Sequence, residues 1–197
     1  MKIKAEIRAD GLHISGYVNV PGRESRPVLT PRGKVVEVIE QRAFQRAIAK
    51  AENIDLMVDH ERVIASTKEG TLSAYEDAVG LRAEAIIKDE EVIKGAKEGK
   101  LKGWSFKMIK IKDDIEERTG KLPLRIVKEF EMPEITLALH KQPVYSSMSI
   151  ELRAGEDEEI EIRATEENID VINLVEKKQE QIDYTEFENK IKKMKEN

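Results

Sequence analysis

The chain has 197 residues, of which 40% are hydrophobic, 37% are charged and 5% are aromatic. Its length fits one ordinary domain with an appendage. The absence of cysteine excludes a thiol nucleophile, a disulfide framework and any cysteine-based zinc or iron–sulfur site. The net charge of −5 and the few aromatic rings argue against nucleic acid as the main partner, because phosphate binding needs a basic face.

Apolar residues are never grouped into a long run. No stretch approaches the roughly 18 apolar residues of a membrane span, and the first residues do not resemble a signal peptide. We therefore expect a soluble protein of a reducing compartment, with no membrane partner.

The acidic charge is concentrated at the C-terminal end. Residues 1–154 contain 27 Lys and Arg against 25 Asp and Glu, a net charge of +2, whereas residues 155–197 contain 7 against 14, a net charge of −7. Such asymmetry commonly marks a tail or an interaction arm. We expect a folded domain at 1–152, followed at 153–197 by an acidic linker and a C-terminal amphipathic helix.

Alternation of apolar and polar residues predicts strands along most of this domain. The first two strands are expected at 3–8 and 14–20, and a Pro- and Gly-rich loop follows at 21–33. Helical spacing predicts a helix over 43–51, and Asp89 can cap a second helix that runs through Lys97. Further strands are expected at 54–58, 71–75, 81–87, 101–111, 122–130, 135–139 and 145–152.

So many consecutive strands with few helices favour an antiparallel sheet or barrel over a parallel doubly wound sheet. The fold class is therefore mostly β (α+β), with seven or more strands and two flanking helices.

Each of the three histidines is a candidate for accepting and returning a proton near neutral pH. His13 lies at the entry to a strand, where a structural role is expected. His60 follows an apolar strand within a charged segment, and its local sequence is typical of a surface histidine as well as of a general base. His140 ends the apolar run 135–139, where a polar strand end competes with a catalytic role.

Ser105 and Glu134 are the remaining candidates for catalysis. Ser105 lies between two aromatic residues just after Gly103, which is typical of a half-buried serine or of a presented nucleophile. The segment lacks the second glycine of a nucleophile elbow. Glu134 opens an otherwise apolar strand, where a rim charge is the ordinary interpretation.

No residues show the spacing of metal ligands, and the glycines do not form a phosphate-binding loop. We expect neither a metal nor a cofactor.

Taken in order, several segments of the domain resemble the prohead (capsid maturation) serine proteases of tailed bacteriophages over about residues 12–152. An apolar strand ends in Asp59-His60, and the glycine–serine segment around Ser105 is similar to the nucleophile segment of that family. Each match is weak alone, but six in the right order are specific. The matching segments are Ile14-Ser15-Gly16-Tyr17, Val36-Glu37-Val38-Ile39 with Arg42-Ala43-Phe44, Met57-Val58-Asp59-His60, Gly70-Thr71-Leu72 with Val79-Gly80-Leu81, Gly99-Lys100-Leu101-Lys102-Gly103-Trp104-Ser105-Phe106, and Glu134-Ile135-Thr136-Leu137 with Pro143-Val144-Tyr145.

The resemblance implies a serine endopeptidase with a β-barrel flanked by helices, like the herpesvirus assemblins. It implies that Ser105 is the nucleophile, that His60 is the general base and that Glu134 orients His60. His140 is the reserve candidate for the third role, because assemblins use a second histidine there. The family pattern often has a small residue soon after the serine, and the departure at Phe106-Lys107 leaves the oxyanion-hole donors unassigned.

By the same resemblance, the substrates are the major capsid protein with its scaffolding segment, other internal prohead proteins and the protease itself. The implied site of action is the assembling prohead in the cytoplasm of the bacterial host. Self-association into a homodimer or a higher oligomer is a separate hypothesis about partners. A catalytically idle scaffold or capsid-assembly protein with the same fold is the main alternative, since fold does not determine function. A cellular β-barrel binding module whose residues align by accident is a second one.

The acidic C-terminal segment has features of its own. Tyr184, Phe187, Ile191 and Met194 recur at helical spacing and form one apolar stripe, which fits a helix docked on its own domain or on a partner. Glu151-Leu152-Arg153-Ala154 and Glu161-Ile162-Arg163-Ala164 form a near-repeat, and self-cleavage within it is a further hypothesis.

Overall fold

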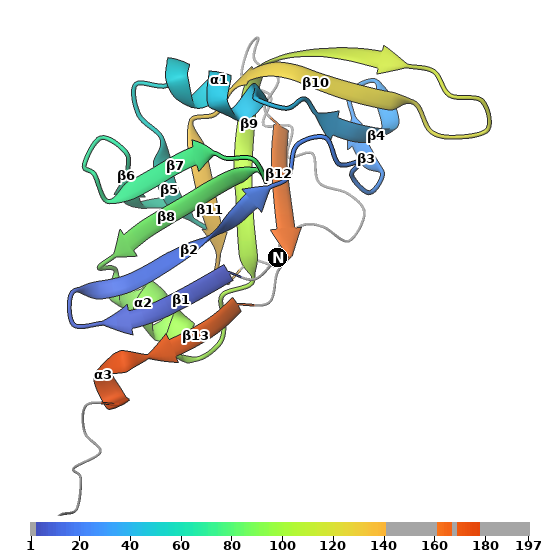
Figure 1. The fold of residues 1–197 in the computed structure, drawn as a ribbon. Helices are drawn as coiled ribbons and strands as arrows, with labels where there is room; N and C mark the ends of the chain where they lie inside the picture. The colour runs from blue at the N-terminus through green and yellow to red at the C-terminus, as the bar shows by residue number, and fades with distance from the viewer. Residues whose placement is uncertain (1–2, 141–160, 167–168, 178–197) are drawn as a thin grey trace, which may run out of the picture.

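The computed structural model describes residues 3–140, 161–166 and 169–177, which form two β-sheets with three helices (Figure 1). The strand order of the first sheet is β13 (Ile169–Asn173), β1 (Ile3–Arg8), β2 (Gly11–Asn19), β8 (Leu81–Ile87) and β7 (Leu72–Glu76). The order of the second is β3 (Val28–Thr30), β4 (Gly33–Ile39), β10 (Leu124–Glu131), β9 (Gly103–Glu116), β11 (Glu134–Ala138), β5 (Asp55–Val58) and β6 (Arg62–Ser66), with β12 (Glu161–Glu166) paired to β9. The helices are α1 (Ala43–Lys50), α2 (Glu90–Lys97) and α3 (Leu174–Lys177).

The mostly β class is confirmed, but the hydrogen-bonded order of the described strands does not close into the expected barrel. The pairing is also not purely antiparallel, because β1 and β13, β4 and β10, and β5 and β11 run parallel. Parallel neighbours need long connections. Each of these pairs is separated by several intervening elements, which provide such a connection.

Both predicted helices of the domain are present, and the side chain of Asp89 accepts a hydrogen bond from the backbone N–H of Val92 at 3.1 Å. Strands β3, β4, β6, β12 and β13 were not expected. β6 has no apolar alternation, because its first residues are exposed and its last are buried. The predicted strand 145–152 and the C-terminal helix lie outside the described residues. Within the described part of the chain, no helix is long and apolar enough to cross a membrane.

Two strands lie beyond Gly155, where the charge balance changes. β12 pairs antiparallel with β9, and Ala164 lies opposite Ser105. β13 pairs parallel with β1 at the edge of the five-stranded sheet. The two sheets therefore include residues from both sides of the boundary expected at residue 152.

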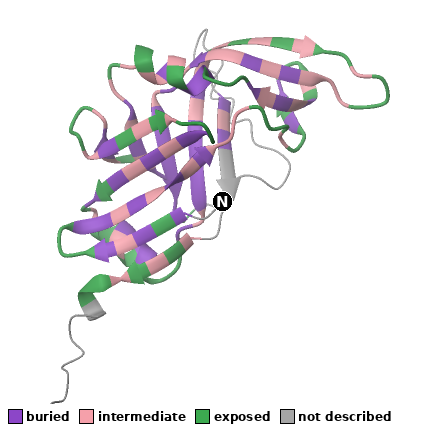
Figure 2. Cartoon of the chain, viewed as in Figure 1, coloured by how far each residue is buried: buried purple, intermediate pink, exposed green. Residues whose placement is uncertain are grey.

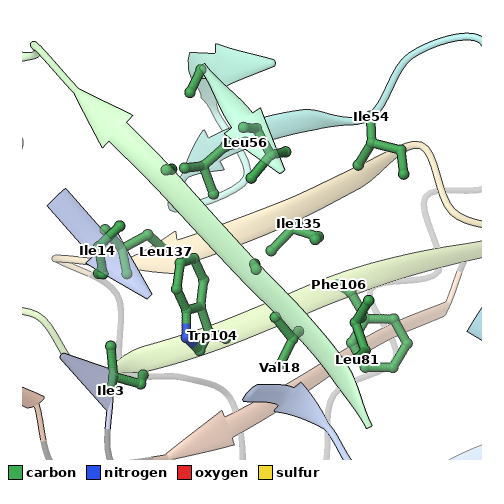
Figure 3. Close-up of a cluster of buried hydrophobic side chains, with 14 of the residues drawn as sticks. Ile3, Ile14, Val18, Ile54, Leu56, Leu81, Trp104, Phe106, Ile135 and Leu137 are labelled. Carbon is green, nitrogen blue, oxygen red and sulfur yellow. The ribbon is translucent and has the colours of Figure 1, made fainter. Parts of the chain in front are cut away.

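Buried side chains of both sheets form one hydrophobic core (Figure 2). Trp104 on β9 is fully buried and lies near Ile3 and Ile14 of the other sheet (Figure 3). The indole is accommodated by Gly16 on β2, where a Cβ atom would lie only 3.1 Å from Trp104 Nε1. This close approach explains why a glycine stands at position 16 of the Ile14-Ser15-Gly16-Tyr17 segment.

A network of buried ion pairs joins β12 to the neighbouring strands. Arg125 on β10 donates to Glu161 at 2.6 Å and to Glu37 at 3.1 Å, and Arg163 makes two hydrogen bonds to Glu37 at 2.7 and 2.8 Å. Arg125 also pairs with Asp113 on β9. Burial alone would raise the pKa of Glu161, but the hydrogen bond from Arg125 and the charges of both arginines outweigh it and hold this pKa below its ordinary value.

Replacing Arg125 by Met is expected to lower the free energy of unfolding by about 3–5 kcal/mol, because buried carboxylates lose their counter-charge. Urea denaturation at neutral pH measures the change. The control is Arg8→Met, which removes an exposed arginine from Glu6 and is expected to change stability little. Equal losses in the two variants would contradict a special role for the buried network.

Candidate active site

Three neighbouring strands bring the candidate residues to one face of the larger sheet. Ser105 on β9 lies opposite Thr136 on β11, and Thr136 lies opposite Met57 on β5. Side chains alternate between the two faces of a strand. Trp104, Phe106 and Met108 point into the core, so Ser105 and Lys107 point to the other face.

His60 lies in the tight turn between β5 and β6. The backbone N–H of Glu61 donates to Val58 O at 3.0 Å, which closes the turn. The two central residues, Asp59 and His60, have φ angles of 51° and 61°. Left-handed conformations at both central positions define a type I′ turn, the kind that suits the twist of a hairpin. The turn places the imidazole beyond the end of β5, beside β11 and β9.

Ser105, His60 and Glu134 form a continuous chain of hydrogen bonds. Ser105 Oγ lies 2.7 Å from His60 Nε2, and Glu134 Oε1 lies 2.6 Å from His60 Nδ1. An ionised carboxylate can only accept hydrogen bonds, so Nδ1 carries the ring hydrogen. Nε2 then accepts from the Ser105 hydroxyl, which is the arrangement that a base needs to remove the serine proton.

Lys107 and Thr136 hold the carboxylate of Glu134. Lys107 Nζ donates to Oε2 at 2.7 Å, and Thr136 Oγ1 lies 3.4 Å from Oε1 and 3.0 Å from His60 Nδ1. Burial alone would raise the pKa of Glu134, but the hydrogen bonds from His60 and Lys107 and the charge of Lys107 outweigh it. The pKa of Glu134 therefore lies below its ordinary value, and the group is ionised at neutral pH.

The site is buried at the serine and open at the histidine. Ser105 is 4% exposed and Glu134 5%, whereas the His60 side chain is 23% exposed. The arrangement joins a hydroxyl, an imidazole and a carboxylate in series, which is the kind of arrangement that can activate a serine hydroxyl. Among the described residues, no group of three or more acidic or histidine side chains could hold a metal ion.

The other two histidines make different contacts. His13 Nε2 lies 2.8 Å from Asp10, in the hairpin of β1 and β2. His140 Nε2 lies 3.1 Å from Glu91 on α2. The carboxylate beside the His60 ring belongs to Glu134, whereas His140 contacts Glu91.

Local sequence reasoning missed Lys107 and Thr136. Both were detectable in principle, because each lies two residues along a strand from a candidate, Lys107 from Ser105 and Thr136 from Glu134. Residues at that spacing share a face of the sheet.

Replacing Lys107 by Met is expected to raise the pKa of Glu134. In the wild-type protein the folded-state pKa of Glu134 lies below the ordinary value of 4.5, so the ion pair contributes its full stability above about pH 4.5 and loses it as pH falls through the folded-state pKa. The variant should be about 1–3 kcal/mol less stable at pH 7, because a buried acceptor loses a partner. This difference should shrink as pH falls below 4.5.

Urea denaturation at several pH values tests this expectation. The control is Lys100→Met, which removes an exposed lysine from Glu98 and should have little effect at any pH. A difference between Lys107→Met and wild type that does not change with pH would mean that Lys107 acts through its alkyl chain and not through Glu134.

One comparison with known proteins gives a match. The family model of the caudovirus prohead serine proteases matches residues 1–163, which is most of the chain and includes every residue of the site. No curated protein and no solved structure was found to match. Because the family model covers well over half of the sequence, the chain belongs to the caudovirus prohead serine protease family.

Proposed function

We propose that this protein is a serine endopeptidase of phage capsid maturation in which Ser105 is the nucleophile, His60 is the general base and Glu134 orients His60. Membership of the prohead serine protease family supports the general role in capsid maturation and the peptidase chemistry. The observation that carries the assignment of residues is the chain of contacts from Ser105 Oγ through the His60 ring to Glu134, at 2.7 and 2.6 Å.

The reaction follows from these contacts as an acyl transfer. Ser105 Oγ attacks the carbonyl carbon of the scissile peptide bond while its proton passes to His60 Nε2. Backbone N–H groups stabilise the oxyanion of the tetrahedral intermediate. His60 then gives the proton to the leaving amine, and a water molecule activated by His60 hydrolyses the acyl-enzyme. Glu134 stabilises the imidazolium in both halves of the reaction.

The substrates in this proposal are the major capsid protein with its scaffolding segment and the protease itself. The reaction would take place inside the assembling prohead in the host cytoplasm. We also propose that the fold is related to that of the assemblins, that residues 1–152 together with β12 and β13 form the protease domain, and that the remainder of the acidic segment at 153–197 serves as linker and docking arm. Self-association into a homodimer belongs to the same proposal.

A catalytically idle scaffold protein with this fold is not favoured. Such a protein has no need for a serine hydroxyl within hydrogen-bond distance of an imidazole that is held by a buried, ionised carboxylate. Arrangements of this kind are typical of activated nucleophiles.

A fluorophosphonate probe, which reacts with activated serines, tests the site without knowledge of the substrate. We expect the wild-type protein to be labelled at Ser105, as read by intact mass and peptide mapping. Ser105→Ala and His60→Ala should lose labelling and peptide cleavage by roughly 10⁴- to 10⁶-fold. Glu134→Gln should lose about 10⁴-fold, because an amide favours the wrong tautomer of His60. Equal labelling of the wild-type and His60→Ala proteins would contradict the assignment.

Self-cleavage is tested by incubating the wild-type and Ser105→Ala proteins at high concentration and measuring their intact masses. We expect truncation of the wild-type chain alone, with the new terminus reporting the cleavage site. Truncation of both chains at the same rate would show that a contaminating protease is responsible, and an intact wild-type chain that still reacts with the probe would remove self-cleavage from the proposal.

A further inference from the structure

Asp59, the residue before His60, has a buried carboxylate that the reaction does not use. It is 5% exposed. Its Oδ1 accepts a hydrogen bond from Leu139 N at 2.8 Å, and its Oδ2 accepts one from His140 N at 3.0 Å. The backbone N–H of Asp59 donates to Leu137 O at 3.1 Å. Asp59 is therefore bonded through backbone and side chain to the end of β11, the strand that carries Glu134.

The chain at the end of β11 is held in place by its packing against α2. Leu139 is 2% exposed and packs against Gly95 of α2, where a Cβ atom would lie only 2.2 Å from Leu139 Cδ1. Arg62, just after the turn, pairs with Asp89 and Glu91 at the start of the same helix. The turn is thus tied to α2 on one side and to the end of β11 on the other.

The turn needs such contacts, because its two central residues are in a left-handed conformation without being glycine. Left-handed conformations of this kind cost of order 1–3 kcal/mol each and persist only where the surroundings enforce them. A shift of the His60 ring by about 1 Å would misalign it with Ser105, and misplacements of that size cost about 100-fold in rate.

We propose that Asp59 is a positioning residue whose carboxylate holds the His60 turn against the end of β11, so that the imidazole lies between Ser105 and Glu134. The kinetic consequence rests on the proposed function above. The positional consequence does not, because the hydrogen bond between His60 and Glu134 can be observed without any substrate.

Three variants separate the carboxylate from the backbone conformation. Asp59→Gly removes the carboxylate but adopts the left-handed conformation without strain. Asp59→Ala removes the carboxylate and adds strain. Asp59→Asn keeps one oxygen acceptor and tolerates the left-handed conformation. We expect the maximal rate of fluorophosphonate labelling to fall about 10- to 100-fold in the Gly and Ala variants, with little change in half-saturating probe concentration, and to be intermediate in the Asn variant.

The matched control is Asp77 in the turn between β7 and β8 of the other sheet. Its carboxylate also accepts hydrogen bonds from two backbone N–H groups, those of Val79 at 2.7 Å and Gly80 at 3.0 Å. Asp77→Gly is expected to lower the melting temperature but to leave the labelling rate of folded protein unchanged. Circular dichroism establishes that each variant is folded at the temperature of the assay.

A second measurement is the far-downfield proton resonance of His60 Nδ1–H, identified by its loss in His60→Ala. We expect it in the wild-type and Asp77→Gly proteins and expect it to be weakened or absent in Asp59→Gly. A wild-type labelling rate and an unchanged resonance in Asp59→Gly would overturn the proposal. The proposal would also be overturned if Asp77→Gly slowed fluorophosphonate labelling as much as Asp59→Gly does. If the wild-type protein does not react with the probe, the proposed function fails, and the resonance alone decides the role of Asp59.

Discussion

The alternation of side chains along β9 is the constraint on which the rest of this structure depends. Trp104, Phe106 and Met108 are fully buried in the core between the two sheets, and the residues between them must therefore point the other way. A shift of one residue in the pairing of β9 would place Ser105 in the core and an aromatic ring at the site. The strongly apolar residues that stabilise the strand thus also determine which face carries Ser105.

Charge is buried in this fold only where a partner compensates for it. The Glu134 carboxylate is shielded from water, but its two oxygens accept hydrogen bonds from His60 and Lys107, and these contacts keep it ionised. Along the other edge of β9, Glu161 and Arg163 of β12 enter a network with Glu37 and Arg125. Isolated buried charges would be neutralised by a shifted pKa, whereas paired ones retain their charge. β9 therefore has compensated buried charges along both edges, those of Glu134 on the β11 side and those of the arginine network on the β12 side.

The sequence predicted local features well and long-range ones poorly. Strands such as 3–8 and 81–87 follow from alternation, and the helix that begins after Asp89 follows from its capping residue, because both signals lie within a few neighbouring residues. β6 was missed because its burial changes along its length instead of alternating. The parallel pairs were missed because they join segments far apart in the chain.

The same limit applies to the site. His60 lies 45 residues from Ser105 and 74 from Glu134, so no local pattern links them. Local sequence alone left a surface histidine, a half-buried serine and a rim carboxylate as the ordinary interpretations. Only the ordered series of family-like segments pointed to all three residues, and the register of β5, β11 and β9 accounts for their contact. Lys107 and Thr136 follow from that register once it is known.

The position of His60 on a turn, and not on a strand, has a physical consequence. Strand pairing sets the directions of Ser105 and Glu134, because their neighbours on both sides are hydrogen-bonded into the sheet. The turn that carries His60 lies outside the strand ladders, and its backbone is held by the bond that closes it and by the bond from Asp59 N–H to Leu137 O. The orientation of the imidazole must therefore come from contacts outside the turn. Such contacts lie at both ends of the turn, where the carboxylate of Asp59 accepts hydrogen bonds from the chain just beyond β11 and the guanidinium of Arg62 pairs with Glu91 of α2, and they support a loop whose central residues are left-handed.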